Sequence, residues 1–84
     1  MAITNVILRT KKAVSELSKF LEVVRQFTNI SSYYEIDENG VHVFFDNGKD
    51  LYMFNTEFYE FCDLCDNEQI MLEKLESCVN YVTM

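Results

Sequence analysis

The chain contains no proline, only two glycines and a single histidine among its 84 residues. Because proline and glycine are common in long irregular connections, their scarcity predicts short loops and leaves little room for a linker. We therefore expect a single domain, residues 1–84. Hydrophobic residues make up 49% of the chain and aromatic residues 14%, which favours a packed core over disorder.

Cysteine is also scarce, and its number is odd. Three cysteines are too few for the disulfide framework of a small secreted domain, which favours a reducing compartment. No apolar run approaches the ~20 residues needed to span a bilayer, and the first residues lack a signal-peptide pattern. We expect a cytoplasmic protein, in the host cytoplasm if a phage encodes it, and no membrane partner.

Basic residues are scarce in only one part of the chain. The net charge is −7, but residues 1–31 hold five basic and two acidic residues (+3), whereas residues 32–84 hold two lysines and twelve carboxylates (−10). Such an acidic surface disfavours nucleic-acid phosphate and anionic lipid, which are bound by lysine and arginine. We expect no direct nucleic-acid binding. The acidity favours a basic protein partner, or simply solubility.

Both glycines lie within residues 33–54, each directly after an asparagine. Asn-Gly between β-rich runs predicts a hairpin turn, because both turn residues need a positive φ angle. Residues 33–54 are therefore predicted to form three short strands. Alternation along them gives one side that faces the core, formed by Tyr34, Ile36, Val41, Val43, Phe45, Leu51 and Met53.

The other side of the predicted sheet carries four aromatic residues, Tyr33, Phe44, Tyr52 and Phe54. Aromatic residues on a sheet can stack nucleic-acid bases, but the neighbouring Glu35, Asp37 and Asp46 would repel nucleic acid. Two interpretations remain: a helix covers these aromatic residues, or they bind a protein. We expect a helix to cover them, because four exposed aromatic residues on a small domain promote aggregation.

A helical pattern precedes the strands. Apolar residues recur every three or four positions up to Phe27, which predicts an amphipathic helix over about residues 4–28 with Thr4 or Asn5 as its N-cap. A short strand followed by a helix from Thr10 is the alternative, because the start of this segment is rich in β-branched residues.

Two further helices are predicted after the strands. Asn55 is expected to cap the first, and the second spans about residues 67–82 after a capping box formed by Asp66 and Gln69. The predicted fold class is α+β: a three-stranded antiparallel β-meander packed with a long N-terminal helix and two C-terminal helices, in the order αβββαα.

No motif of catalysis, metal binding or cofactor binding stands out. Cys62 and Cys65 have the spacing of a redox or zinc pair, but both are expected on the apolar side of a helix, where cysteine packs as a small hydrophobe. A zinc site that also used Cys78 and His42 would lack a second short-spaced pair. His42 is expected to pair with Glu35 or Asp37 across the strands. We predict that the protein is not an enzyme and holds no metal or cofactor.

The predicted partner-binding residues lie on the last two helices: Glu57, Glu60, Asp63, Asp66, Glu73, Glu76 and Tyr59. Carboxylates at i, i+3 spacing destabilise a helix slightly, and only Lys74 is interspersed among them. A solvated helix face is the simplest interpretation. A spaced array of carboxylates can also imitate a nucleic-acid backbone and attract a basic groove.

In size, charge and mix of elements, the chain resembles the small acidic α+β proteins that phages and mobile elements encode to inhibit host enzymes, including DNA mimics and anti-CRISPR proteins. It also resembles toxin-neutralising immunity proteins. The resemblance implies an inhibitor that occupies a basic groove of a nucleic-acid-handling host protein. The alternatives are a structural or assembly protein that forms a homodimer, and a nucleic-acid binder that uses Lys11, Lys12, Lys19 and Arg25.

Overall fold

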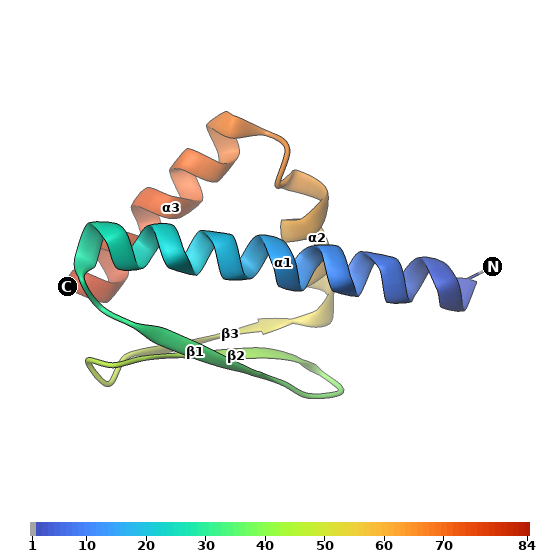
Figure 1. Ribbon diagram of the computed structural model, residues 1–84, viewed down its shortest axis with the longest axis horizontal. Helices are drawn as coiled ribbons and strands as arrows, with labels where there is room; N and C mark the ends of the chain where they lie inside the picture. Colours follow the sequence, from blue (N-terminus) through green and yellow to red (C-terminus); the bar gives the residue numbers. More distant parts are fainter. Residues whose placement is uncertain (1) are drawn as a thin grey trace.

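The computed structural model describes residues 2–84, and the side chains of residues 11–84. Three helices and three strands follow one another in the order αβββαα, which confirms the predicted α+β fold (Figure 1). Their bounds are α1 Ala2–Thr28, β1 Ser32–Ile36, β2 Gly40–Phe45, β3 Asp50–Phe54, α2 Asn55–Leu64 and α3 Glu68–Thr83. The strands form an antiparallel meander in the order β1-β2-β3. None of these helices, over the described residues, is long and apolar enough to cross a membrane.

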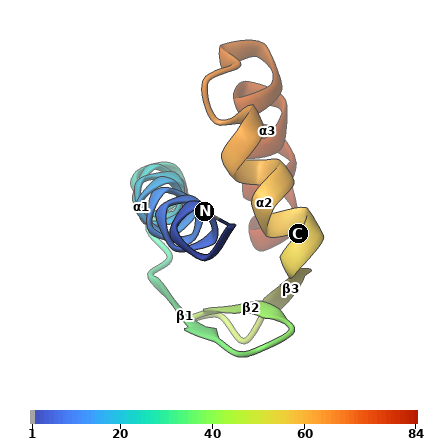
Figure 2. The same cartoon turned by 90° about the vertical axis from the view of Figure 1, so that its right-hand side faces the viewer.

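All three helices lie on the same side of the sheet (Figure 1). In the end-on view of Figure 2, α1 stands on one side of the molecule, α2 and α3 stand on the other, and the sheet lies beneath both. No helix within residues 2–84 covers the opposite face. The expectation that a helix covers the aromatic side is therefore wrong, because all three helices pack on the core-facing side of the strands.

The core lies between the helices and one face of the sheet. From α1 it takes Ala13, Leu17, Leu21 and Val24, whose spacing of three or four residues places them on one side of the helix. The other buried core residues are Val41, Val43, Phe45, Phe58, Phe61, Cys62 and Val82. Strand alternation is confirmed at Val41, Val43 and Phe45. Ile36 was predicted to face the core but is 51% exposed, at the end of the edge strand β1.

A single unbroken helix forms α1, so the alternative of an initial strand is wrong. The helix begins at Ala2, and Thr4 and Asn5 are therefore not its N-cap. It ends at Thr28, where Asn29 adopts a left-handed conformation (φ 58°) and its N–H donates to the Arg25 carbonyl at 2.7 Å. At ~1.5 Å per residue α1 is about 40 Å long, and its N-terminal end extends past α2 and the sheet (Figure 1).

The two Asn-Gly pairs play different structural roles. Gly48 has a positive φ of 91° in the β2–β3 turn, as predicted, whereas its neighbour Asn47 is not among the residues with positive φ. Gly40 is not among the residues with positive φ; it begins β2 opposite Phe54, where an added Cβ atom would overlap the carbonyl oxygen of Met53. The β1–β2 turn is instead closed by Asp37, whose Oδ1 accepts the N–H groups of Asn39 at 2.7 Å and Gly40 at 2.9 Å.

The N-cap of each C-terminal helix lies one residue away from the predicted cap. Phe54 is the N-cap of α2 and makes no side-chain capping bond, whereas Asn55 donates its side-chain amide to the Glu38 carbonyl at 2.8 Å. At α3 the N-cap is Asn67 rather than Asp66, and its Oδ1 accepts the Ile70 N–H at 3.1 Å. The capping box of Asp66 and Gln69 is therefore wrong.

Candidate functional site

The predicted acidic residues are exposed, but they lie in separate parts of the helical side of the molecule. Glu57 and Glu60 line a hollow of about 370 Å³ enclosed by all three helices and the sheet, together with Lys74. Glu73 and Glu76 line a different hollow, of about 500 Å³, together with Phe27 of α1. Asp63 is exposed on α2, and the half-buried Tyr59 ring stacks on Phe58 with centroids 6.5 Å apart. These side chains therefore do not form one continuous array.

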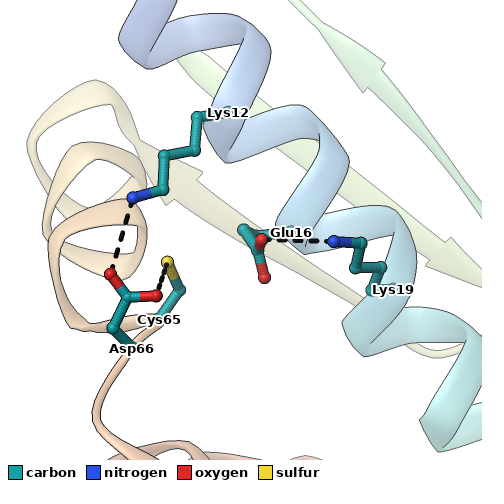
Figure 3. Close-up of polar contacts among 5 residues, drawn as sticks. All are labelled: Lys12, Glu16, Lys19, Cys65 and Asp66. Atoms are coloured by element: carbon teal, nitrogen blue, oxygen red, sulfur yellow. Dashed lines mark hydrogen bonds and ion pairs between the residues drawn. The ribbon is translucent and has the colours of Figure 1, made fainter.

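Asp66 lies where α2 gives way to α3, and it faces α1. Its Oδ2 is 3.7 Å from Lys12 Nζ, and its Oδ1 accepts a weak hydrogen bond from the Cys65 thiol at 3.9 Å (Figure 3). The nearby carboxylate raises the pKa of Lys12. Burial, and then the Asp66 charge, raise the pKa of the Cys65 thiol. A redox cysteine needs the opposite shift, so Cys65 resembles a structural thiol.

Three of the four basic residues considered for nucleic-acid binding pair with carboxylates. Lys12 pairs with Asp66 as above, and Lys19 Nζ lies 3.5 Å from Glu16 Oε1 (Figure 3). Arg25 forms two hydrogen bonds with Glu22, at 3.0 Å and 2.5 Å, which lower the pKa of the Glu22 carboxyl. Paired cations attract phosphate less than isolated ones, since part of their charge is already compensated.

The four residues weighed against a zinc site do not form a metal-binding group in the structure. Cys62 is buried in the core, as expected for a small apolar residue, and Cys78 packs against that core from α3. His42 lies on β2, on the face of the sheet that bears no helix. Among residues 11–84, no group of three histidine, cysteine or acidic side chains is placed to hold a metal ion.

That open face of the sheet carries a continuous series of five stacked or edge-on rings. We call this series the ring ladder: Tyr33, Phe44, His42, Tyr52 and Phe54. Successive ring centroids are 5.0, 4.0, 5.7 and 5.1 Å apart, distances at which aromatic rings attract one another. The ladder runs diagonally across all three strands. Its end residues are the most exposed, at 56% for Tyr33 and 59% for Phe54.

Two carboxylates hold the middle of the ring ladder in place. The His42 Nε2 atom lies 2.5 Å from Asp50 Oδ2, and the Tyr52 hydroxyl donates to Asp37 Oδ1 at 3.0 Å. The expected pairing of His42 with Glu35 or Asp37 is therefore wrong: Glu35 is opposite His42 in the β-ladder, but the bond goes to β3. The two backbone N–H groups, and then the Tyr52 hydroxyl, lower the pKa of Asp37.

The surroundings of the ring ladder are acidic. Glu35 and Asp37 lie at one corner of the open face, and Asp50 lies at the opposite corner. The three strands contain no lysine or arginine. The nearest cation in sequence, Lys49, donates instead to the Tyr81 and Met84 carbonyls of the C-terminal helix, at 2.7 and 2.8 Å.

Sequence reasoning found four members of the ring ladder but not their exposure. Alternation along the strands also places His42 on the same face as Phe44 and Tyr52. The strand register supplies the missing information, since it pairs Tyr33 with Phe44 and His42 with Tyr52.

A third surface is an apolar groove between α1 and α3. Its lining includes Phe20 and Val23 of α1 and Met71, Leu72 and Leu75 of α3, and its volume is about 390 Å³. Leu72 and Leu75 also line the hollow beside Phe27, so the two depressions adjoin. Phe27 and Leu72 are 70% and 61% exposed.

Comparison with known proteins gives no relative: no family model, no curated protein and no solved structure matches the chain.

Proposed function

We propose that this protein is a non-enzymatic binding module that attaches to a basic protein and inhibits or modulates it. Proteins encoded by phages or mobile elements against nucleic-acid-handling host enzymes are the class in which we place it. The assignment to this class rests on small size and acidity, which many small inhibitors share.

One observation carries the proposal: the carboxylates of α2, α3 and the turn between them are exposed, and a single basic residue lies among them in sequence. Seven acidic residues of residues 57–76 are exposed, against the single Lys74. On α2, Glu57 and Glu60 are one helical turn apart, a spacing at which like charges cost a few tenths of a kcal/mol. A basic partner would relieve this repulsion and would be attracted over a distance of about one Debye length, ~8–10 Å.

The test compares two variants of equal charge. Glu57→Gln/Glu60→Gln/Asp63→Asn removes three carboxylates from α2, and Glu35→Gln/Glu38→Gln/Asp46→Asn removes three from the sheet and its turns. Each raises the net charge from −7 to −4. Tagged wild type and both tagged variants are incubated with nuclease-treated bacterial lysate at low and high salt. The captured proteins are identified by mass spectrometry.

We expect wild type to capture a basic protein at low salt and to lose it at high salt. At least one triple variant should lose it at low salt as well. Capture that is indifferent to salt and to both variants would contradict the proposal, because the carboxylates would then contribute nothing to binding.

Self-association is the second candidate function, and the shape of α1 favours it. The helix is about 40 Å long, close to the longest dimension of the molecule, 42 Å. Its N-terminal end extends past the other elements (Figure 1). Phe27 and Leu72 are exposed in the hollow between α1 and α3. Light scattering that reports a monomer at millimolar protein would exclude this candidate.

A further inference from the structure

We propose that the ring ladder is the docking site for an extended, arginine-bearing segment of the basic partner. The inference rests on the proposed function, and it adds the surface and the chemistry of the contact. Three properties of the open face support it: the rings are exposed, they are held in place, and carboxylates flank them.

The first property is exposure without cover. Within residues 2–84 all helices pack on the other side of the sheet, and Tyr33 and Phe54 are each more than half exposed. The core-facing residues of the central strand β2, Val41 and Val43, are completely buried. The sheet thus buries the core-facing side of its central strand while presenting aromatic rings on the other face, and exposed apolar patches of this kind commonly mark binding surfaces.

The second property is preorganisation. His42 is fixed between the Phe44 ring at 4.0 Å and the Asp50 carboxylate at 2.5 Å. Tyr52 is fixed by its hydrogen bond to Asp37. Rings that are already immobile lose little conformational entropy when a ligand binds, which favours them as the central contacts of an interface.

The third property is charge, and it selects the occupant. A guanidinium group stacks flat on tyrosine and phenylalanine rings and can also pair with a carboxylate, so arginine satisfies both features of this face. Lysine has no planar group to stack and is more strongly hydrated. Nucleic acid would be repelled by Glu35, Asp37 and Asp50, and an apolar segment would desolvate these carboxylates without bringing a cation to any of them.

A second copy of the chain is a poor occupant of the same face. Self-docking of two open faces would bring Glu35, Asp37 and Asp50 of each copy toward one another, with no lysine or arginine on the strands to compensate. An extended peptide fits the geometry better. Its alternate side chains are ~6.7 Å apart, which is more than the 4.0–5.7 Å between neighbouring rings of the ladder, so successive arginines can each contact a different ring.

The experiment titrates isotope-labelled full-length protein with two synthetic peptides, Gly-Arg-Ser-Arg-Ser-Arg-Gly and its lysine counterpart, followed by NMR. Tyr33→Thr/Phe44→Thr removes two rings and keeps β-branched residues in the strands. Phe27→Thr/Leu72→Thr is the matched control, since it removes two large exposed side chains from the helical side of the molecule, Leu72 from the α1–α3 groove and Phe27 from the hollow that adjoins it. Circular dichroism verifies that each variant is folded.

We expect the arginine peptide to shift the signals of Tyr33, Phe44 and Tyr52 and to bind more tightly than the lysine peptide. Loss of two cation–π contacts should weaken binding about tenfold in the ring variant, and the groove variant should bind as wild type does. Shifts confined to the helices, equal binding of both peptides, or displacement of the peptide by oligothymidine would overturn the inference. Burial of the rings in a dimer of the free protein would also overturn it.

Failure of this inference is distinguishable from failure of the proposed function. If a basic protein is captured from lysate but only Glu57→Gln/Glu60→Gln/Asp63→Asn releases it, the binding module stands and the ring ladder is not its contact. If the arginine peptide binds the rings and no salt-sensitive partner is captured, the site stands and the proposed function fails.

Discussion

Replacement of Gly40 by alanine should destabilise the protein far more than the same change at Gly48. Gly40 faces Phe54 across the β2–β3 pair, and a Cβ atom there would overlap the Met53 carbonyl oxygen and lie 2.9 Å from Phe54 Cα. These are backbone atoms at the junction of β3 and α2, so they cannot move aside as a flexible side chain would. Relief of the overlap requires β3 to shift, together with the start of α2.

Overpacking of this kind typically costs 1–3 kcal/mol, and we take the upper end, about 3 kcal/mol, because the obstacle is backbone. For a domain of this size, such a loss lowers the melting temperature by roughly 12–24 °C. Gly48 has open space around it, and its cost arises only from its positive φ of 91°. A left-handed alanine costs about 1–2 kcal/mol, so the corresponding decrease is roughly one third to two thirds as large.

Urea and thermal unfolding followed by far-ultraviolet circular dichroism would measure both variants beside wild type. The order of stability should be wild type, then Gly48→Ala, then Gly40→Ala. The free energy of unfolding of Gly40→Ala could instead lie within 1 kcal/mol of the wild-type value, or above that of Gly48→Ala. Either result would show that β2 and β3 do not approach as closely at Gly40 as the structure has them.

Three further predictions concern single side chains. Asn67→Ala should cost about 1 kcal/mol through loss of the α3 cap, whereas Asp66→Ala should cost little, as measured by urea unfolding; equal losses would contradict the cap assignment. The folded-state pKa of Asp37 lies below its unfolded value. The stabilising effect of the ionised carboxylate is therefore complete above the unfolded pKa of about 3.9, and it disappears as pH falls through the lower folded value. Asp37→Asn should flatten the loss of stability below pH ~4 in acid unfolding curves. Desolvation raises the pKa of both partly buried thiols, Cys65 and Cys78, so both should react slowly with iodoacetamide at neutral pH and rapidly in urea. Rapid alkylation of either thiol in the folded protein would contradict the raised pKa.

The order of elements could be predicted from the sequence because its signals are local. Apolar residues at helical spacing define α1 over most of its length, and alternation places Val41, Val43 and Phe45 in the core. The N-cap and first residue of each helix could not be predicted in the same way. At the α2–α3 junction, Asp66 and Asn67 are both good capping residues, and the choice of Asn67 depends on where α2 ends against α1.

The exposure of the aromatic face depends on tertiary packing, which composition cannot reveal. Four aromatic residues on a small domain favour cover by a helix. In the structure, however, all three helices within residues 2–84 pack on the other face of the sheet. Likewise, helical spacing put the carboxylates of α2 and α3 in one group, because it describes each helix alone. In the structure Glu57 and Glu60 line one hollow, and Glu73 and Glu76 line another.

The two proposed contacts lie on opposite sides of the sheet, and this restricts the partner. The ring ladder faces away from the core, whereas the carboxylates of α2 and α3 lie on the helical side (Figure 2). A partner with one narrow basic groove can contact only one of these surfaces at a time. A partner that contacts both must surround the edge of the sheet, and changes at sites so far apart would then weaken the same complex additively. Additive losses in Tyr33→Thr/Phe44→Thr combined with Glu57→Gln/Glu60→Gln/Asp63→Asn would therefore indicate one enclosing partner. Loss from only one of the two sets would indicate that a single side of the molecule is the binding surface.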